Sequence, residues 1–255
     1  MNLLFIIATF VLAAAKGIRV EMPWVPVLAS IGFFIYAFVY AYRSTWIAVS
    51  TWRVSQLLIF SAFFALLTDV VAYGCVLQDD WLLAADAALG INAREWAEWM
   101  NSNRAVHRVM HIAYFSLIPQ LILACLMSGK AIIKWLQVSA FITVVGFALC
   151  PAMGTYSETD IIDHNAPIKQ RMDDLSSMEV GVLRIQDCEG IICMPSFHTI
   201  CGCLLIAAFW PSRLRYWIVG LNVLMIVSTI PIGAHYVVDV IAGILVATFV
   251  IKTVR

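Results

Sequence analysis

Residues 193–199 read CMPSFHT, and residues 233–239 read GAHYVVD. Each stretch lies where a polar segment enters an apolar run that is longer and more uniform than a helix of a soluble protein. Together they place two histidines and one aspartate at the edge of apolar segments. A catalyst that acts on lipid headgroups needs ionisable side chains at that position, so these stretches organise the interpretation of the whole chain.

The composition indicates an integral membrane protein. Hydrophobic residues make up 62% of the 255 residues and charged residues only 13%, whereas soluble domains are about half apolar and about one quarter charged. Several apolar runs approach the roughly 20 residues that cross a bilayer. The net charge is zero, which argues against a nucleic-acid partner. We predict an all-α integral membrane protein with spans at residues 2–15, 24–42, 54–77, 104–128, 131–153, 195–210, 214–232 and 235–252.

The first of these spans is the shortest. Residues 2–15 are few for a membrane span and resemble the apolar core of a signal peptide. No basic residue precedes them, as a signal peptide would require. We therefore expect a retained helix.

The distribution of charge predicts the orientation in the membrane. The short loops and the tail that share one side carry basic residues and no acidic ones: Arg43, Arg53, Lys130, Lys134, Arg213, Arg215, Lys252 and Arg255. By the positive-inside rule this side faces the cytoplasm. Residues 154–194 and both histidine stretches then face outward. We expect a multi-pass protein of a plasma or inner membrane, with its site on the periplasmic face in a bacterium or the lumenal face in a eukaryote.

Residues 79–103 break the apolar pattern without forming a free loop. Tryptophans and leucines alternate with carboxylates there, which is typical of helices that lie in the membrane interface. We expect this segment to form a lid or collar.

The two histidines return to the same membrane surface, because one helix, a short turn and one returning helix separate His198 from His235. Asp239 follows His235 by one helical turn, so its carboxylate can accept a hydrogen bond from one imidazole nitrogen and leave the other free to attack. A carboxylate orients a histidine in the same way in a catalytic triad, but here the histidine itself would be the nucleophile. His198 suits a general acid for a leaving alkoxide.

Ser196 completes the set, since it directly precedes the helix that carries His198. Its hydroxyl and the nearby backbone N–H groups can bind an anion at the positive end of the helix dipole. No metal-binding set is apparent in the sequence, so we expect no metal and no other cofactor, and an in-line displacement through a phosphohistidine. Each histidine alone would be interpreted as a polar helix cap, but the combined pattern is specific.

Residues 154–194 form the longest polar segment, and such a loop between membrane helices is usually functional or disordered. Its only cations are Lys169, Arg171 and Arg184. They are our candidates for holding a phosphate group, and a solvated salt bridge is the alternative role for each. A disulfide between Cys188 and Cys193 in the same loop is an open alternative in an oxidising compartment.

Asp69 lies inside the predicted third span. A carboxylate inside a membrane span often belongs to a functional site. The position of Asp69 toward the outer end of the span instead favours a hydrogen bond to a neighbouring helix. It is not among our candidate site residues.

A family resemblance follows from the two histidine stretches. Residues 194–199 resemble the second signature of the type 2 phosphatidic acid phosphatase superfamily, and residues 228–239 resemble its third. The resemblance implies a six-helix core within residues 54–252, preceded by about two extra N-terminal transmembrane helices. It implies His235 as nucleophile, Asp239 orienting it, His198 as general acid, Ser196 binding phosphate, and no metal cofactor. We accordingly divide the chain into N-terminal transmembrane helices (1–53) and a phosphatase-like catalytic domain (54–255).

The chain departs from the superfamily pattern in ways that resemble one branch. Thr229 stands where an arginine is usual, Phe197 stands where glycine is common, and the first signature is missing. These changes resemble inositol phosphorylceramide synthases, which move a headgroup between lipids. Further similarity to that branch lies in residues 86–90, 114–120 and 189–192. Lys169, Arg171 and Arg184 would then substitute for the missing phosphate-binding signature.

We predict a membrane lipid phosphatase or phosphotransferase that acts on a lipid phosphate ester or diphosphate. A headgroup phosphotransferase like the inositol phosphorylceramide synthases is the alternative, and a non-catalytic lipid-binding or transport protein is a further one. The expected partners are a lipid phosphate or phospholipid substrate and the bilayer.

Overall fold

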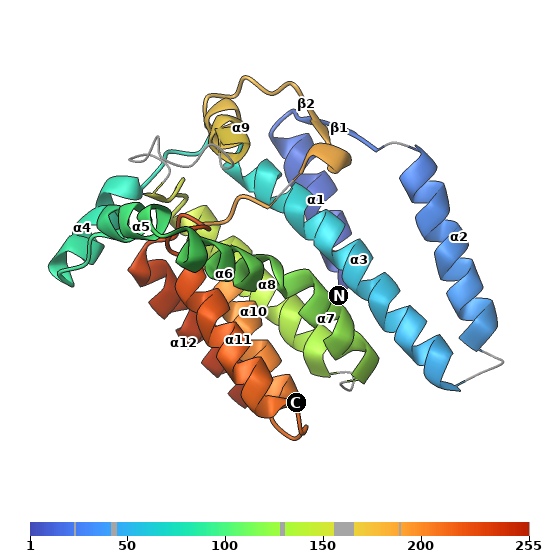
Figure 1. Ribbon diagram of the computed structural model, residues 1–255. Coiled ribbons are helices and arrows are strands. Elements are labelled where there is room, and N and C mark those ends of the chain that lie inside the picture. Colours follow the sequence, from blue (N-terminus) through green and yellow to red (C-terminus); the bar gives the residue numbers. More distant parts are fainter. Residues whose placement is uncertain (23, 42–44, 128–130, 156–165, 189, 255) are drawn as a thin grey trace.

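The computed structural model describes residues 1–22, 24–41, 45–127, 131–155, 166–188 and 190–254, and this part of the chain is mostly helical (Figure 1). Among these residues, three helical stretches are long and apolar enough to cross a membrane: Val49–Ala72, Arg104–Met127 and Ala131–Leu149. They support the prediction of a helical membrane protein. The orientation stays a prediction, and Arg43, Lys130 and Arg255, on which it partly depends, lie outside the described residues.

Most elements follow the predicted spans, and α1 coincides with the first of them. In chain order, the elements are α1 (Asn2–Ala15), β1 (Arg19–Glu21), α2 (Trp24–Ala41), α3 (Thr45–Ala72), α4 (Asp79–Ala88), α5 (Ala93–Ser102), α6 (Arg104–Phe115), α7 (Leu117–Met127), α8 (Ala131–Leu149), α9 (Ala166–Ser176), β2 (Val182–Arg184), η3 (Ile185–Asp187), α10 (Phe197–Phe209), α11 (Arg215–Ser228) and α12 (Val237–Thr253).

Helix α3 differs from the predicted span 54–77 at both ends. It begins at Thr45, because residues 45–53 contain no glycine or proline that would stop a helix. It ends at Ala72, shortly before Gly74, which has a φ of 67°. Glycine tolerates this left-handed conformation, which commonly ends helices.

The predicted span 104–128 is divided at Ser116 into α6 and α7. Pro119 explains the break, because it lacks an N–H and its ring would clash with the carbonyl group of Phe115. The hydroxyl group of Ser116 donates to the carbonyl oxygen of Ala113 (2.6 Å) and stabilises the end of α6.

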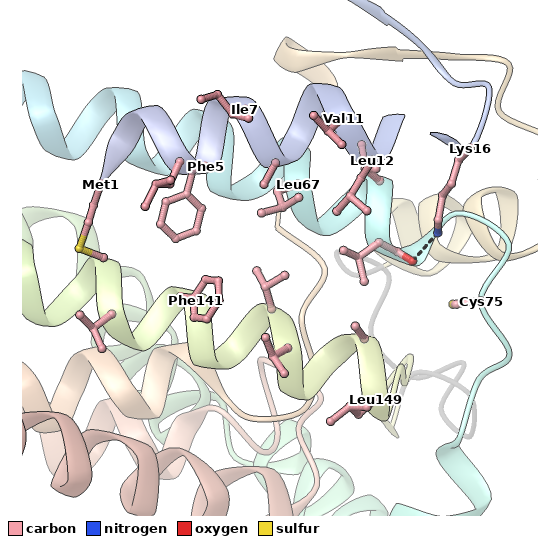
Figure 2. Close-up of a pocket in the computed structure, with 18 residues that line it drawn as sticks. Met1, Phe5, Ile7, Val11, Leu12, Lys16, Leu67, Cys75, Phe141 and Leu149 are labelled. Carbon is pink, nitrogen blue, oxygen red and sulfur yellow. Dashed lines mark hydrogen bonds between the residues drawn. The ribbon is translucent and has the colours of Figure 1, made fainter. Parts of the chain in front are cut away.

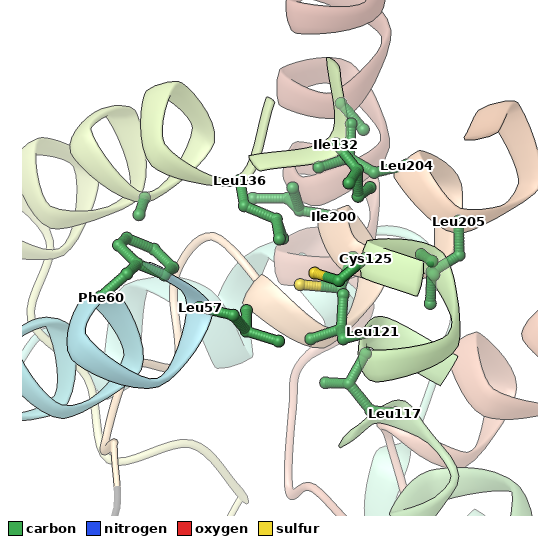
Figure 3. Packing of buried hydrophobic residues seen from close by; sticks show 14 of the residues in the cluster. Leu57, Phe60, Leu117, Leu121, Cys125, Ile132, Leu136, Ile200, Leu204 and Leu205 are labelled. Atoms are coloured by element: carbon green, nitrogen blue, oxygen red, sulfur yellow. The ribbon is translucent and has the colours of Figure 1, made fainter. Parts of the chain in front are cut away.

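Helix α10 lies in the middle of the bundle, where it packs against α7, α8, α11 and α12. Figure 3 shows its residues Ile200, Leu204 and Leu205 beside buried side chains of the other helices, among them Leu121 and Ile132. These side chains are packed closely and are removed from contact with water or lipid. This packing stabilises the bundle. The two histidine stretches begin at one end of this core.

The predicted collar, residues 79–103, forms α4 and α5, which lie over one end of the bundle (Figure 1). Trp81, Trp96 and Trp99 are exposed there, and their position at headgroup level stays a prediction. Helix α9 lies near the same end and belongs to the long loop. Polypeptide from two regions therefore lies at this end of the bundle.

A short parallel sheet is the one departure from an all-helical chain among the described residues. Strand β1 pairs with β2 so that Arg19 lies opposite Val182 and Glu21 opposite Arg184. The pairing connects the segment after α1 with the long loop before α10. Our sequence prediction missed it, because each strand is only three residues long.

A groove of about 1,020 Å³ runs between α1, α3 and α8 (Figure 2). Its lining side chains are apolar except at one end, where Lys16 donates hydrogen bonds to the carbonyl oxygens of Val71 (3.0 Å) and Tyr73 (2.7 Å). Neither histidine of the two stretches lines this groove. This groove is thus separate from the two histidines of the candidate site.

Candidate active site

Backbone contacts bring the starts of α10 and α12 together. The N–H group of Ser196 donates to the carbonyl oxygen of Asp239 (3.1 Å). Gly243 permits the close approach, because a Cβ atom there would lie 2.8 Å from the carbonyl oxygen of Ser196. As a result, His198 and His235 line one cavity of about 50 Å³. The structure thus brings together the two histidines that the sequence placed on one surface.

His235 and Asp239 face each other in the protein interior. Their side chains are 4% and 0% exposed, and His235 Nδ1 lies 3.5 Å from Asp239 Oδ2. This separation exceeds that of a normal hydrogen bond. Asp239 Oδ2 instead accepts hydrogen bonds from the backbone N–H of Tyr236 (2.8 Å) and from the thiol of Cys193 (2.9 Å). The carboxylate is therefore fixed beside Nδ1 of His235, and the attacking role of Nε2 stays a prediction.

The ring of His198 stacks on Tyr114. The ring centroids are 4.3 Å apart and the planes are inclined by 16°. Gly233 makes room for this arrangement, since a Cβ atom there would lie 2.9 Å from Tyr114 and 3.1 Å from the ring of His235. Tyr114 lies in a stretch that the branch resemblance singled out, but the sequence did not indicate a contact with His198.

Ser196 is the N-cap of α10, in agreement with the predicted helix start. Its Oγ atom accepts hydrogen bonds from the backbone N–H (3.4 Å) and the hydroxyl group (3.1 Å) of Thr199. The residue is fully buried and does not line the histidine cavity. In this arrangement its hydroxyl group stabilises the helix start, and phosphate binding by Ser196 remains a prediction.

The three cations of the long loop occupy different environments. Arg171 on α9 donates to Asp69 on α3 through Nη2 (2.7 Å) and Nε (3.2 Å). Arg184 on β2 is exposed and lies 3.4 Å from Glu21 on β1. Lys169 is half-buried on α9, and no salt bridge joins it to a carboxylate among the described residues. As far as the described residues define the cavity, none of the three cations lines it.

Two carboxylates of α4 hold the backbone around His235, and the sequence analysis did not identify them as site residues. Asp79 accepts hydrogen bonds from the N–H groups of Met153 (3.0 Å) and Gly154 (2.8 Å) and from the hydroxyl group of Tyr236 (3.2 Å). Asp86 accepts from the N–H groups at the start of α12. Burial raises the pKa of both carboxyl groups, and the backbone hydrogen bonds act in the opposite direction.

The cover of the cavity is apolar. Ile168 and Met172 come from successive turns of α9, and Ile191 and Ile192 come from the segment before α10. The long loop therefore places hydrocarbon side chains over the histidines.

Cys193 is part of the site and is a free thiol, as is Cys188. The thiol of Cys188 donates to the carbonyl oxygen of Arg184 (3.3 Å), whereas that of Cys193 donates to Asp239. Burial, followed by the nearby Asp239 carboxylate, raises the pKa of Cys193. Cys193, His235 and Asp239 also form a group that could hold a metal ion, so the expectation of a site without metal stays a prediction.

The fold and the site define a helical membrane protein with two histidines and one aspartate gathered at one end of its bundle. The family model described as PAP2 superfamily matches residues 80–253. The match covers more than half of the chain, and the chain belongs to this superfamily. Its members are generally phosphatases or phosphotransferases, which indicates phosphatase-type phosphoester chemistry. No curated protein and no solved structure matches the chain.

The match confirms the predicted resemblance at the level of the superfamily. Similarity to inositol phosphorylceramide synthases stays a prediction, as does the division of the chain after residue 53. The matched region begins in α4 and ends in α12, so it contains every site residue that we predicted from the sequence.

Proposed function

We propose that the protein is a membrane lipid phosphatase or phosphotransferase that works through a phosphohistidine at His235. The observation that carries this proposal is the single cavity shared by His198 and His235, with Asp239 beside Nδ1 of His235. A histidine oriented by a carboxylate and opposed by a second histidine has the parts needed for nucleophilic catalysis with general acid assistance. Superfamily membership supports the same chemistry.

The proposed reaction has two displacements at phosphorus. Nε2 of His235 forms a bond to phosphorus while the bond from phosphorus to the leaving oxygen breaks, and His198 donates a proton to that oxygen. Water or an acceptor alcohol then attacks the phosphohistidine. His198 takes the proton of this second nucleophile, and the bond from Nε2 to phosphorus breaks. Asp239 stabilises the positive charge on His235 in both steps. We propose no metal and no other cofactor for this chemistry.

For the phosphate group we propose Ser196 and the loop cations Lys169, Arg171 and Arg184. Lys169 is the first candidate, because it lies on α9 between Ile168 and Met172, which line the cavity. Arg171 and Arg184 are engaged with carboxylates in the structure. A direct role for either would require it to leave that partner.

Transfer to a lipid acceptor is the alternative to hydrolysis, and the apolar cover favours it. Side chains of α9 and of residues 191–192 line the cavity together with the histidines, and we propose that they keep water out of the site. Excluding water prolongs the life of an intermediate that water would hydrolyse. A headgroup phosphotransferase like the inositol phosphorylceramide synthases would use the same residues. We place the reaction at the periplasmic or lumenal face of a plasma or inner membrane.

The test is a turnover assay on a panel of lipids. Purified protein in liposomes is incubated with lipid phosphates, lipid diphosphates and phospholipid–acceptor pairs, and both free phosphate and new lipids are measured. His235→Ala should abolish turnover, whereas His107→Ala, a histidine of α6 that does not line the cavity, should leave it near the wild-type level. Free phosphate identifies a phosphatase, and a new phospholipid without free phosphate identifies a transferase.

The same assay addresses the metal and the non-catalytic alternative. A chelator should leave turnover intact, and a loss that a divalent ion restores would show a metal requirement. Absence of turnover on the whole panel, together with lipid binding that His235→Ala weakens, would instead identify a lipid-binding or transport protein.

A further inference from the structure

Cys193, His235 and Asp239 form a compact group of three possible metal ligands. One ligand atom from each lies within 4.8 Å of the others, and all three residues are buried. Cys193 Sγ lies 2.9 Å from Asp239 Oδ2, and His235 Nδ1 lies 3.5 Å from the same oxygen. Cys193 comes from the segment before α10, and the other two residues come from the start of α12. The fold therefore holds three chemically different ligands at one point.

Two polar atoms of this group have no hydrogen-bond partner among the described residues. They are His235 Nδ1 and Asp239 Oδ1, and both are buried. Buried polar atoms are nearly always hydrogen-bonded, because leaving one without a partner costs free energy. A cation between the three side chains would coordinate His235 Nδ1 directly, and its positive charge would stabilise the buried Asp239 carboxylate through Oδ2, the oxygen nearest Nδ1 and the thiol.

The ligand types select the kind of cation. Thiolate, imidazole and carboxylate are the three side-chain ligands that Zn²⁺ uses in proteins, whereas Mg²⁺ and Ca²⁺ prefer oxygen ligands only. Ligands on one tetrahedral Zn²⁺ lie about 3.3–3.7 Å apart, given its usual bond lengths. His235 Nδ1 and Asp239 Oδ2 are 3.5 Å apart, within this range. Cys193 Sγ and Asp239 Oδ2 are closer, at 2.9 Å, because the thiol donates a hydrogen bond to the carboxylate, and they would separate slightly once zinc replaces the thiol proton. A fourth position would face the cavity, which both Cys193 and His235 line.

We propose that Cys193, His235 and Asp239 bind Zn²⁺, and that the bound ion inhibits the enzyme. Binding breaks the S–H bond of Cys193, forms the bond from sulfur to zinc and releases the proton to water. The ion then occupies Nδ1 of His235 and the carboxylate of Asp239, so the carboxylate no longer supports positive charge on the imidazole. The binding site stands on the geometry alone, whereas inhibition rests on the proposed role of His235.

The binding test uses Co²⁺ as a spectroscopic substitute for Zn²⁺. Chelator-treated protein in detergent is titrated with Co²⁺, and the near-ultraviolet absorption of a thiolate–cobalt bond is recorded before Zn²⁺ is added in competition. Wild-type protein should bind one equivalent with this absorption, and Zn²⁺ should displace it. Cys193→Ser should lose the absorption and bind at least tenfold more weakly, since even residues that only support metal ligands change affinity 10- to 100-fold.

Matched variants keep the binding test decisive. Cys203→Ser makes the same chemical change on α10 outside the group and should bind Co²⁺ as the wild type does. His235→Ala should weaken binding as Cys193→Ser does, and thermal unfolding verifies that each variant is folded. Binding by Cys193→Ser with wild-type affinity and absorption would overturn the proposed site, and so would absence of binding to the wild type.

The activity test separates the two proposals. With a lipid that the wild type turns over, Zn²⁺ should inhibit, a chelator should restore the rate, and Cys193→Ser should need at least tenfold more Zn²⁺ for half-inhibition relative to its own uninhibited rate. If the protein shows the cobalt absorption but Zn²⁺ does not inhibit it, the metal site is supported and the proposed role of His235 is contradicted. If the protein turns over no lipid, the proposed function is wrong. The cobalt titration still tests the metal site in that case, because it does not depend on activity.

Discussion

The carboxylate of Asp86 on α4 accepts a hydrogen bond from the backbone N–H of Val237, the first residue of α12, at 2.8 Å. Its second oxygen accepts from the N–H of Val238 at 3.0 Å. The first N–H groups of a helix lack partners within the helix, and negative charge is favourable there. Asp86 therefore caps α12 although it lies far away in the sequence. The capped helix begins two residues after His235.

We expect Asp86→Asn to weaken this cap and to move the segment of His235. An amide offers only one oxygen and no charge, so stability should fall by about 1–2 kcal/mol. Displacement of the nucleophile should lower kcat by about ten- to a hundredfold with a smaller change in KM. Thermal unfolding and steady-state kinetics measure both effects. Asp80→Asn, an exposed neighbour, is the control, and wild-type kcat in Asp86→Asn would refute the positioning role.

Gly243→Ala should separate the two histidine stretches. The new Cβ atom would lie 2.8 Å from the carbonyl oxygen of Ser196 and 3.0 Å from Cβ of Thr199. Overpacking of this kind costs about 1–3 kcal/mol, and α10 should shift away from α12. Both the unfolding temperature and kcat should therefore decrease.

The matched control for this prediction is Gly220→Ala on α11. A Cβ atom there meets nothing within 4 Å, so the variant should gain up to about 1 kcal/mol from higher helix propensity. If both variants behave alike, the tight contact at Gly243 does not position the site.

Arg171→Met should destabilise the protein, because it leaves the Asp69 carboxylate buried without its guanidinium partner. Removing one member of a buried ion pair costs about 3–5 kcal/mol. Asp69→Leu combined with Arg171→Met should recover most of this stability, since an apolar pair replaces both charges. Unfolding in detergent measures the stability. A folded double variant with wild-type KM assigns Arg171 a structural role, whereas a raised KM assigns it to the phosphate.

Lys169→Gln should raise KM by about tenfold and leave stability nearly unchanged. The half-buried side chain lies on α9 beside the cover of the cavity, and a hydrogen bond to a charged group contributes about 1.5–3 kcal/mol. Kinetics with a lipid phosphate measure the effect. Lys169→Arg, which keeps the charge, should retain most of the affinity, and equal KM values for all three proteins would remove Lys169 from the site.

Turnover should depend on pH with a bell-shaped profile. The proposed mechanism requires His235 to be neutral for attack and His198 to be protonated for donation, so activity should decline on both sides of an optimum. The profile of kcat over KM measures this in the free enzyme. A profile that is flat from mildly acidic to mildly alkaline pH, with chemistry rate-limiting, would contradict a mechanism with two histidines.

The periodic part of the fold was predictable from the sequence, because long apolar runs have few alternatives to membrane helices. The end of α3 and the break at Ser116 were not predicted, although Gly74 and Pro119 carry the local signals for both. The sheet between β1 and β2 carried no such signal. Its strands are too short to produce a pattern, and their pairing depends on the distant positions of two loops.

The candidate site was predictable where its residues lie one helical turn or one hairpin apart, as for His235 with Asp239 and His198 with His235. The contacts of Asp79, Asp86 and Tyr114 join regions far apart in the chain, so spacing could not reveal them. For Arg171, the sequence showed a cation near the site but could not show that Asp69 is its partner. Local chemistry was therefore accessible from the sequence, whereas the tertiary contacts that support it were not.

The pairing of β1 with β2 has a consequence for the order of events during synthesis. Arg19 leaves the ribosome early, and its partner Val182 leaves much later, after most of the helices. Domains fold as their residues become available, so β1 must wait for its partner strand. The segment that covers the histidines is thus among the last parts of the protein to assemble, and newly made chains should acquire their helical bundle before they acquire a closed site.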